Sequence, residues 1–282
     1  MSERLADVRT RIAGVGQLGT VVNAMRGIAA ARAQAARNQL AAVDAYAQTI
    51  ASSIGRALTL TAPAPAAARR RGPRGLVLFG AEQGFAGAFS ERIFDALGDD
   101  LAGCELFLVG ARAAVVAGQR DIQPFWTIAM PSHSDAAPKF ADRIAQKIFE
   151  RIALDKVVRL DMAFSSWQAG RGFAVERARL FPLDISLFPR AIEQVAPLVH
   201  LPADELLRDL AADYLHAELC RAILHSFAAE NEARIEAMAS TRRQVDKMLE
   251  GLRADERRIR QEEITSEIIE LSAGRSATEQ ET

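Results

Sequence analysis

A glycine-rich segment is the closest approach in this chain to a ligand-binding motif. Gly80, Gly84 and Gly87 follow the apolar run of residues 76–79 and precede an expected helix over residues 89–97. Backbone N–H groups between a strand and a helix N-terminus are a common cradle for a phosphate group. The spacing is not GxGxxG, however, and no GKS or GKT occurs in the chain. A tight turn is therefore the favoured interpretation, and nucleotide binding is the alternative.

The other chemically capable side chains form no catalytic or metal-binding pattern. The four histidines are spread along the chain without metal-ligand spacing. Paired acids such as Asp204/Glu205 and Glu262/Glu263 lie in a long helical stretch and are typical of a solvated face. No nucleophile elbow or serine–histidine–aspartate spacing is present. We therefore expect no catalytic centre, no bound metal and no cofactor.

The composition is that of an ordinary globular chain. It has 282 residues, of which 49% are hydrophobic, and a net charge of −1. Such a balance gives no electrostatic reason to expect nucleic acid or an anionic membrane as a partner. No apolar run is long enough to form a transmembrane helix. Cys104 and Cys220 lack CxxC spacing, which favours two reduced thiols in the core.

The N-terminal part of the chain is expected to form a long helix with a seven-residue repeat. Two interleaved heptad series indicate a coiled-coil seam, because a 3.5-residue spacing keeps one stripe against a partner helix. The first series is Val8, Val15, Val22, Ala29, Ala36, Val43, Ile50 and Ala57, and the second is Ile12, Gly19, Arg26, Ala33, Leu40, Ala47 and Ile54. Only Gly19 and Arg26 interrupt the apolar pattern.

The middle of the chain changes from heptads to alternating strands and helices. Strands are expected over residues 76–79, 105–109, 122–128, 156–164 and 176–181, and helices over 89–97, 111–118 and 135–153. This alternation predicts a mostly parallel sheet with helices on its faces. The predicted division is an N-terminal coiled-coil helix over 1–58, a linker over 59–75, an α/β domain over 76–200, a C-terminal coiled-coil helix over 203–272 and a disordered tail over 273–282. The fold class is α/β, with an antiparallel coiled coil of the terminal helices beside a central Rossmann-like domain.

The C-terminal helix repeats the heptad pattern and is the natural partner of the first helix. Met238, Val245, Leu252 and Ile259 form one series, and Thr241 and Met248 occupy the other seam position. An antiparallel pairing with Leu58 opposite Glu205 places Leu5 opposite about Arg258 and Arg26 near Met238. The second helix then extends beyond its partner from Ile259 to Ser272. Ile264, Ile268, Ile269 and Leu271 would be exposed there, so we expect another protein to enclose this tip.

Two terminal segments identify a resemblance that covers nearly the whole chain. Residues 23–32, NAMRGIAAAR, resemble the signature AMKMVAAxK, with arginine in place of the usual lysine, and residues 260–268, RQEEITSEI, resemble RQxxITxEI. Both signatures belong to the gamma subunit of F-type ATP synthases. The middle departs from that family, because residues 81–90 read AEQGFAGAFS where SDRGLCGGLN is usual. The departure suggests a divergent branch, of an alternate or sodium type, and puts in doubt any family contact made through this loop.

The resemblance implies a non-catalytic rotor subunit that couples ion-driven rotation of a membrane ring to the catalytic beta subunits. Implied partners are the alpha and beta subunits, the epsilon subunit and the c-ring, with no nucleic acid and no transmembrane segment of its own. The implied location is peripheral, on the cytoplasmic face of a bacterial inner membrane. Implied beta-subunit contacts are Met25, Arg26, Arg260, Gln261 and Thr265, and the implied apolar bearing tip is Ile264, Ile268, Ile269 and Leu271. The alternatives are a nucleotide-binding α/β protein with helical dimerisation arms and a coiled-coil adaptor.

Overall fold

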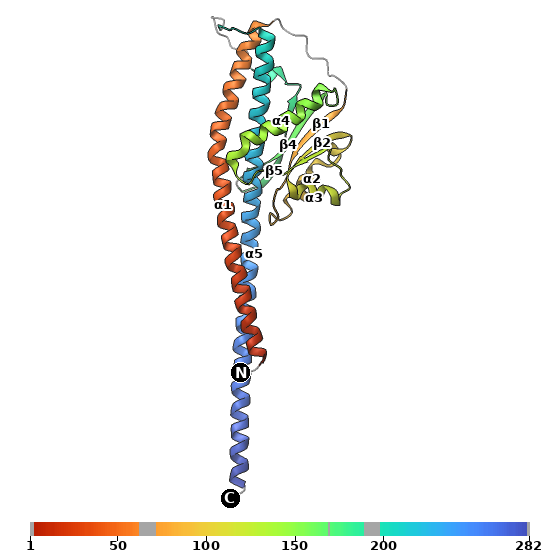
Figure 1. The fold of residues 1–282 in the computed structure, drawn as a ribbon. Coiled ribbons are helices and arrows are strands. Elements are labelled where there is room, and N and C mark those ends of the chain that lie inside the picture. The colour runs from red at the N-terminus through yellow and green to blue at the C-terminus, as the bar shows by residue number, and fades with distance from the viewer. Residues whose placement is uncertain (1–2, 62–71, 169, 189–197, 281–282) are drawn as a thin grey trace. The chain divides into compact units, whose positions relative to one another are not determined.

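The computed structural model describes residues 3–61, 72–168, 170–188 and 198–280. Two long helices and one sheet make up most of these residues (Figure 1). Helix α1 spans Glu3–Ala57 and ends in the short 3-10 turn η1, Leu58–Leu60, whereas α5 spans Ala203–Gln280. Neither helix contains a proline, so no residue blocks its backbone hydrogen bonds. Most of the predicted linker, residues 62–71, lies outside the described residues.

The sheet has five strands in the order β3-β2-β1-β4-β5. The strands are β1 (Arg74–Phe79), β2 (Cys104–Val109), β3 (Trp126–Ile128), β4 (Arg159–Gln168) and β5 (Gly172–Phe181). The pairs β1–β2, β1–β4 and β2–β3 are parallel, and β4–β5 is antiparallel. The predicted mostly parallel sheet is thereby confirmed. A short hairpin suffices to return the chain from β4 to β5, whereas parallel pairs need a longer crossover.

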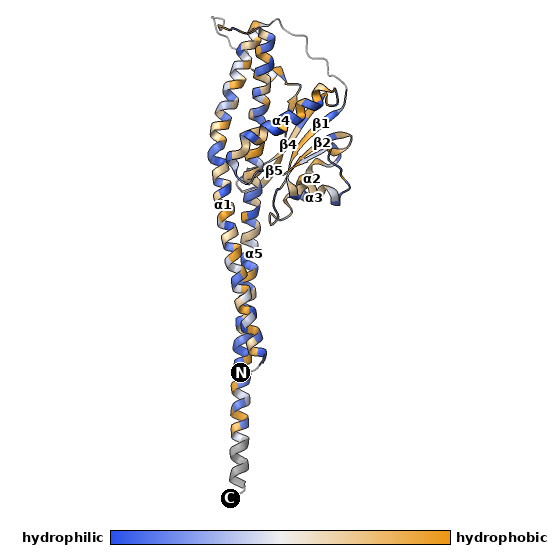
Figure 2. Ribbon diagram, viewed as in Figure 1, coloured by the Kyte–Doolittle hydropathy of each residue, from blue (hydrophilic) through white to orange (hydrophobic). Residues whose placement is uncertain are grey.

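Helices cover both faces of the sheet, and the strands alternate between the two cores. The helices are α2 (Phe89–Leu97), α3 (Ala111–Gln119) and α4 (Ala137–Ala153). The 3-10 turn η2 (Gly98–Leu101) follows α2, η3 (Ser134–Ala136) precedes α4, and η4 spans Ile185–Leu187. Val77 and Phe79 of β1 belong to the core that contains α4 and residues 215–228 of α5. Leu76 and Leu78 belong to the core beneath α2 and α3. This two-residue alternation explains why residues 76–79 of β1 are all apolar, as the orange part of the strand in Figure 2 shows.

Several boundaries differ from those expected. The strand predicted over 122–128 is reduced to Trp126–Ile128, and β4 and β5 are longer than expected. Helix α5 continues to Gln280, whereas the sequence predicted an end at Ser272 and a disordered tail over 273–282. The residues after Ser272 include no proline to stop a helix.

The described chain falls into two compact units, whose bounds differ from those of the domains predicted from the sequence. Residues 1–28 and 235–282 form the coiled-coil unit, and residues 29–234 form the sheet-containing unit. In the sheet-containing unit the second half of α1 packs through buried alanines, Ala29, Ala33 and Ala36. In this unit α5 is buried almost all round its circumference between residues 215 and 234. Small side chains at this point allow α1 and α5 to approach closely.

The coiled-coil unit confirms the predicted antiparallel pairing. Leu5 and Val8 of α1 form a small core with Ile259 of α5. The predicted partner of Leu5 was Arg258, so the register was correct to within one residue. The predicted series of Met238, Val245, Leu252 and Ile259 is buried throughout. Met248 is the exception on the second series, because 55% of it is exposed.

Candidate functional site

The glycine-rich loop of residues 80–87 is filled by the protein's own carboxylates. One oxygen of Glu82 accepts hydrogen bonds from the backbone N–H groups of Ala111 and Met130, each at 2.8 Å. Ala111 is the first residue of α3, where the helix dipole favours a negative charge. The Glu82 side chain therefore caps the N-terminus of α3. The loop is a structural turn stabilised by its own acidic side chain.

Two buried ionic side chains of α5 complete this loop. Glu230 accepts from the backbone N–H groups of Glu82 at 2.8 Å and Gln83 at 3.1 Å. Arg234 donates to the carbonyl oxygens of Gly84 at 3.2 Å and Gln83 at 3.3 Å, and it also forms an ion pair with Glu230. The cavity beside the loop measures about 120 Å³, well below the roughly 300 Å³ at which ligand pockets begin. These contacts leave no open cradle for a nucleotide.

The described residues offer no metal site and no membrane span. Among them, no group of three or more histidine, cysteine, aspartate or glutamate side chains is arranged to hold a metal ion. Likewise, no described helix is both long and apolar enough to cross a bilayer. Cys220 is buried as expected, and burial raises the pKa of its thiol to about 12, whereas Cys104 is only half-buried. The residues predicted to contact other subunits all lie on the coiled-coil unit.

Met25 and Arg26 lie on α1 at a point where the helix has an exposed apolar side. Met25 is half-buried and Arg26 is exposed, although the heptad pattern placed Arg26 in the seam. Its long side chain reaches solvent, which avoids the cost of burying a charge. No ion pair of Arg26 occurs among the described residues, so its guanidinium is accessible to a partner protein.

An apolar stripe beside Met25 was not anticipated from the heptads. Leu18, Val21 and Ile28 are 50%, 55% and 55% exposed. Their spacing of three and seven residues places them on one side of α1 with Met25, outside the buried seam. The signal was visible in the sequence as an additional apolar row, because a two-helix coiled coil needs only two heptad positions. This stripe is a surface on which another protein could pack.

The second set of predicted contact residues lies near the start of α1. Arg260 forms an ion pair of 3.1 Å with Glu256, whose carboxylate also accepts from Arg9 at 2.9 Å. The hydrogen bond from Arg9 is the main reason that the pKa of Glu256 lies below its ordinary value. The hydroxyl of Thr265 donates to the carbonyl oxygen of Gln261. The side chains of Arg260, Gln261 and Thr265 remain exposed.

The structure does not bring the two predicted sets together. The packing of Leu5 against Ile259 places Arg260 beside the start of α1. Met25 lies twenty residues further along the same helix, which corresponds to ~30 Å at 1.5 Å per residue. The coiled-coil unit therefore has two separate candidate contact surfaces.

The end of α5 is an exposed apolar tip, defined here by Ile264, Ile268, Ile269 and Leu271. These four side chains are 50%, 60%, 62% and 75% exposed. Figure 1 shows α5 continuing past the start of α1, so no second helix covers this part of the coiled-coil unit. Four large exposed apolar residues within two turns of a helix are typical of a protein contact surface.

Comparisons with known proteins agree on one family. The sequence model of a family described as ATP synthase matches residues 4–278. The chain is 26% identical to the ATP synthase gamma chain of Solibacter usitatus, over 98% of this chain and 99% of that protein. It is 24% identical to the ATP synthase gamma chain of Anaeromyxobacter dehalogenans, over 97% and 99% of the two chains. The fold resembles a chain in the rotor of the Euglena gracilis mitochondrial ATP synthase, with a TM-score of 0.65, 12% identity and coverage of 93% and 99%.

Proposed function

Because the chain belongs to the ATP synthase gamma-chain family, we propose that it is the central-stalk rotor subunit of an F-type ATP synthase. In this role it couples ion-driven rotation of the membrane ring to conformational changes in the catalytic beta subunits. The chain itself is non-catalytic in this proposal. Glu230 supports that part, because its carboxylate occupies the backbone N–H groups of Glu82 and Gln83 in the glycine-rich loop.

The exposed apolar tip carries the proposal. A single helix with Ile264, Ile268 and Leu271 at least half exposed gains free energy if an apolar collar encloses it. Contact through apolar surface is not directional, so an enclosed helix can turn without breaking specific hydrogen bonds. The ring of alternating alpha and beta subunits supplies this collar in the proposed assembly, with the tip of α5 as the bearing.

Met25, Arg26, Arg260, Gln261 and Thr265 are the proposed contacts with the beta subunits. All except the half-buried Met25 are exposed on the coiled-coil unit. A rotor needs contacts that form and break at each step. Exposed ion pairs contribute about 0–1 kcal/mol each and satisfy that need, whereas fully buried pairs would hold the rotor in one position.

The coiled-coil unit presents different chemistry at two levels along its length, which supports a switching role. The stripe of Leu18, Val21 and Ile28 is apolar, whereas the side that carries Arg260 and Glu256 is ionic. Each surface lies on one side of the unit, so a beta subunit meets it at some angles of the rotor and not at others. Each surface favours one conformation of that subunit over another, which shifts its equilibrium between open and closed states.

The remaining parts of the proposal concern the other partners and the location. We place the epsilon subunit and the c-ring against the sheet-containing unit. The proposed location is peripheral, on the cytoplasmic face of a bacterial inner membrane. The relatives from Solibacter and Anaeromyxobacter support a bacterial enzyme.

Co-purification tests the proposal directly. The full chain is co-expressed with the alpha and beta subunits encoded in the same genome, and the complex is isolated through a tag on beta. We expect a stable complex that hydrolyses ATP. A variant that lacks residues 264–282 should fold normally, as measured by circular dichroism, but form a complex that loses the rotor more readily. Failure of the full chain to associate with alpha and beta would contradict the proposed function.

A further inference from the structure

A pocket rich in arginine lies on the sheet-containing unit. It measures about 300 Å³ and is lined by Arg74, Leu76, Leu97, Asp100, Arg159, Asp161, Met162, Arg177, Ala178 and Arg179. We call it the arginine pocket. It lies where β1 and β4 begin, beside the end of α2 and the turn η2. The strand register brings its walls together, because Asp161 pairs with Leu76 of β1 on one side and Arg179 of β5 on the other.

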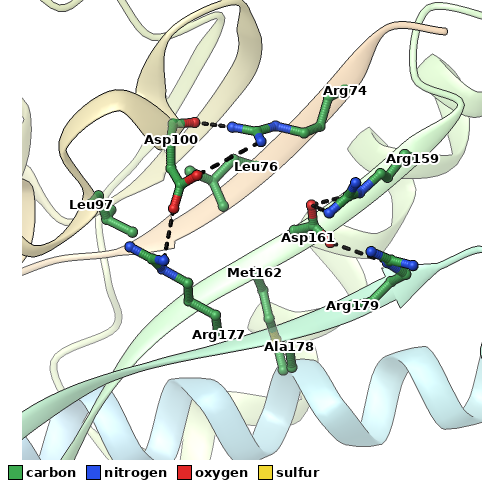
Figure 3. A pocket seen from close by; sticks show the side chains of 10 residues that line it. All are labelled: Arg74, Leu76, Leu97, Asp100, Arg159, Asp161, Met162, Arg177, Ala178 and Arg179. Atoms are coloured by element: carbon green, nitrogen blue, oxygen red, sulfur yellow. Dashed lines mark hydrogen bonds and ion pairs between the residues drawn. The ribbon is translucent and has the colours of Figure 1, made fainter. Parts of the chain in front are cut away.

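The charged side chains form two groups on opposite sides of the pocket (Figure 3). In one group Asp100 lies between Arg74, at 3.9 Å, and Arg177, at 2.8 Å. The carbonyl oxygen of Asp100 also accepts a hydrogen bond from Arg74. The carboxylate thus fixes two guanidinium groups that would otherwise repel each other.

The second group repeats this arrangement. Asp161 lies between Arg159, at 2.9 Å, and Arg179, at 3.5 Å. Asp161 is the least exposed of these three, with 19% of its side chain accessible against 45% for each arginine. The carboxylate therefore sits low in the pocket, and the two guanidinium groups stand nearer to solvent.

The pocket carries an excess of positive charge over an apolar floor. Its four arginines and two aspartates leave a net charge of +2. Each guanidinium has five N–H donors in a planar fork and is always charged. Leu76 and Leu97, which are almost fully buried, supply apolar surface beside the charged groups. Low-dielectric walls around one sign of charge strengthen the field in a cleft.

We propose that the arginine pocket binds a small phosphate-bearing anion. A phosphate ester carries about −1.5 to −2 charges at pH 7, which matches the excess in the pocket. Guanidinium groups bind phosphate oxygens through paired N–H donors. The volume falls at the lower end of the ~300–1,000 Å³ typical of ligand pockets, which favours a compact ligand. This inference does not depend on the rotor function.

The phosphate group can belong to a soluble compound or to the headgroup of an anionic lipid. Isothermal titration calorimetry of the full chain with inorganic pyrophosphate and with ADP tests the soluble source. Sedimentation with phosphatidylcholine vesicles, with and without phosphatidylglycerol, tests the lipid source. We expect saturable binding in one of these two arms, weakened by added salt as charge–charge contacts are.

Matched variants tie the binding to the pocket. Arg177→Gln and Arg179→Gln each remove one charge from a half-exposed side chain, and each should weaken binding by about tenfold. Arg171→Gln is the control, because Arg171 is exposed at the end of the same strand pair and does not line the pocket. Asp161→Asn adds a unit of positive charge and should tighten binding, which distinguishes anion binding from general damage to the fold.

Three results would overturn the proposal. The first is no saturable binding of pyrophosphate, ADP or phosphatidylglycerol vesicles by a chain whose circular dichroism shows it to be folded. The second is a loss in Arg171→Gln as large as that in Arg177→Gln, which would indicate unspecific attraction. The third is tighter binding of a tetraglutamate peptide than of any phosphate probe, which would assign the pocket to an acidic segment of a protein partner.

Discussion

Arg9 and Glu256 form an ion pair of 2.9 Å that links α1 to α5 near the start of the chain. The two residues are separated by 247 positions in sequence, so this contact exists only in the paired coiled coil. Glu256 also forms an ion pair of 3.1 Å with Arg260. One carboxylate therefore connects the pairing of the two helices to a residue that we propose as a contact with the beta subunits.

The first prediction concerns pH. The pKa of Glu256 is lowered from 4.5, mainly by its hydrogen bond with Arg9. A lowered pKa means that the stabilising contribution of Glu256 is present above pH 4.5 and is lost as the pH falls through the lowered value. Glu256→Gln should therefore lower the melting temperature of the full chain at pH 7, and the difference from the unaltered chain should shrink as the pH is lowered below 4.5.

Glu250→Gln is the control for this pH effect, since Glu250 is exposed on the same helix and has no ion pair among the described residues. Its melting temperature should follow that of the unaltered chain throughout this pH range. If Glu256→Gln and the unaltered chain melted together at pH 7, the ion pair would have no role in holding the helices together.

The second prediction concerns the small residues between α1 and α5 in the sheet-containing unit. Ala36 is fully buried there, whereas its neighbour Ala35 is exposed. Ala36→Leu should destabilise the chain by about 1–3 kcal/mol, because the added atoms overpack a close helix contact. Ala35→Leu should leave the stability nearly unchanged, since alanine and leucine have similar helix propensities. Urea unfolding measures both, and equal stability of the two variants would contradict the close packing at Ala36.

The third prediction concerns the buried pair of Glu230 and Arg234, whose side chains are 4% and 6% exposed. Arg234→Met should cost about 3–5 kcal/mol, because it leaves the Glu230 carboxylate buried without its cation. The double variant Glu230→Gln/Arg234→Met should recover much of that loss, since no buried charge remains. The free energy of unfolding of the single and double variants is compared, and a double variant less stable than Arg234→Met would contradict the explanation.

The helices and strands with a regular sequence pattern were predictable, because burial in them follows the local repeat of apolar residues. The heptads placed Leu5 within one residue of its observed partner, since one apolar stripe specifies both the face and the register of an antiparallel pair. The alternation of strands and helices predicted the parallel part of the sheet in the same way. The family resemblance also rested on local segments, at residues 23–32 and 260–268.

The features that depend on distant residues were not predictable. Nothing near Glu82 indicates that its carboxylate would cap α3, or that Glu230 of α5 would bind the same loop. The arginine pocket needs the strand order, because Arg74, Arg159 and Arg177 come from three separate strands. The exposure of Arg26 depends on its side-chain conformation, which a heptad position does not specify.

The fourth prediction concerns Arg26, which is exposed and lacks an ion pair among the described residues. Arg26→Ala should change the stability of the isolated chain by no more than about 0.5 kcal/mol, as surface substitutions usually do. In the assembled enzyme it should reduce the coupling between ATP hydrolysis and ion pumping modestly, because one weak contact is lost. Arg11→Ala, on the exposed side of the same helix, serves as the control. A variant that cannot assemble with alpha and beta would indicate a structural role for Arg26 instead.

The central claim is that this chain turns inside a ring of alpha and beta subunits. The most direct measurement attaches a visible probe, through an introduced surface cysteine at Ala35, to the full chain in a complex with immobilised alpha and beta subunits, and follows the probe after ATP is added. The account predicts rotation in one direction, in repeated steps, that stops when ATP is removed. ATP hydrolysis by the complex while the probe stays still would contradict it.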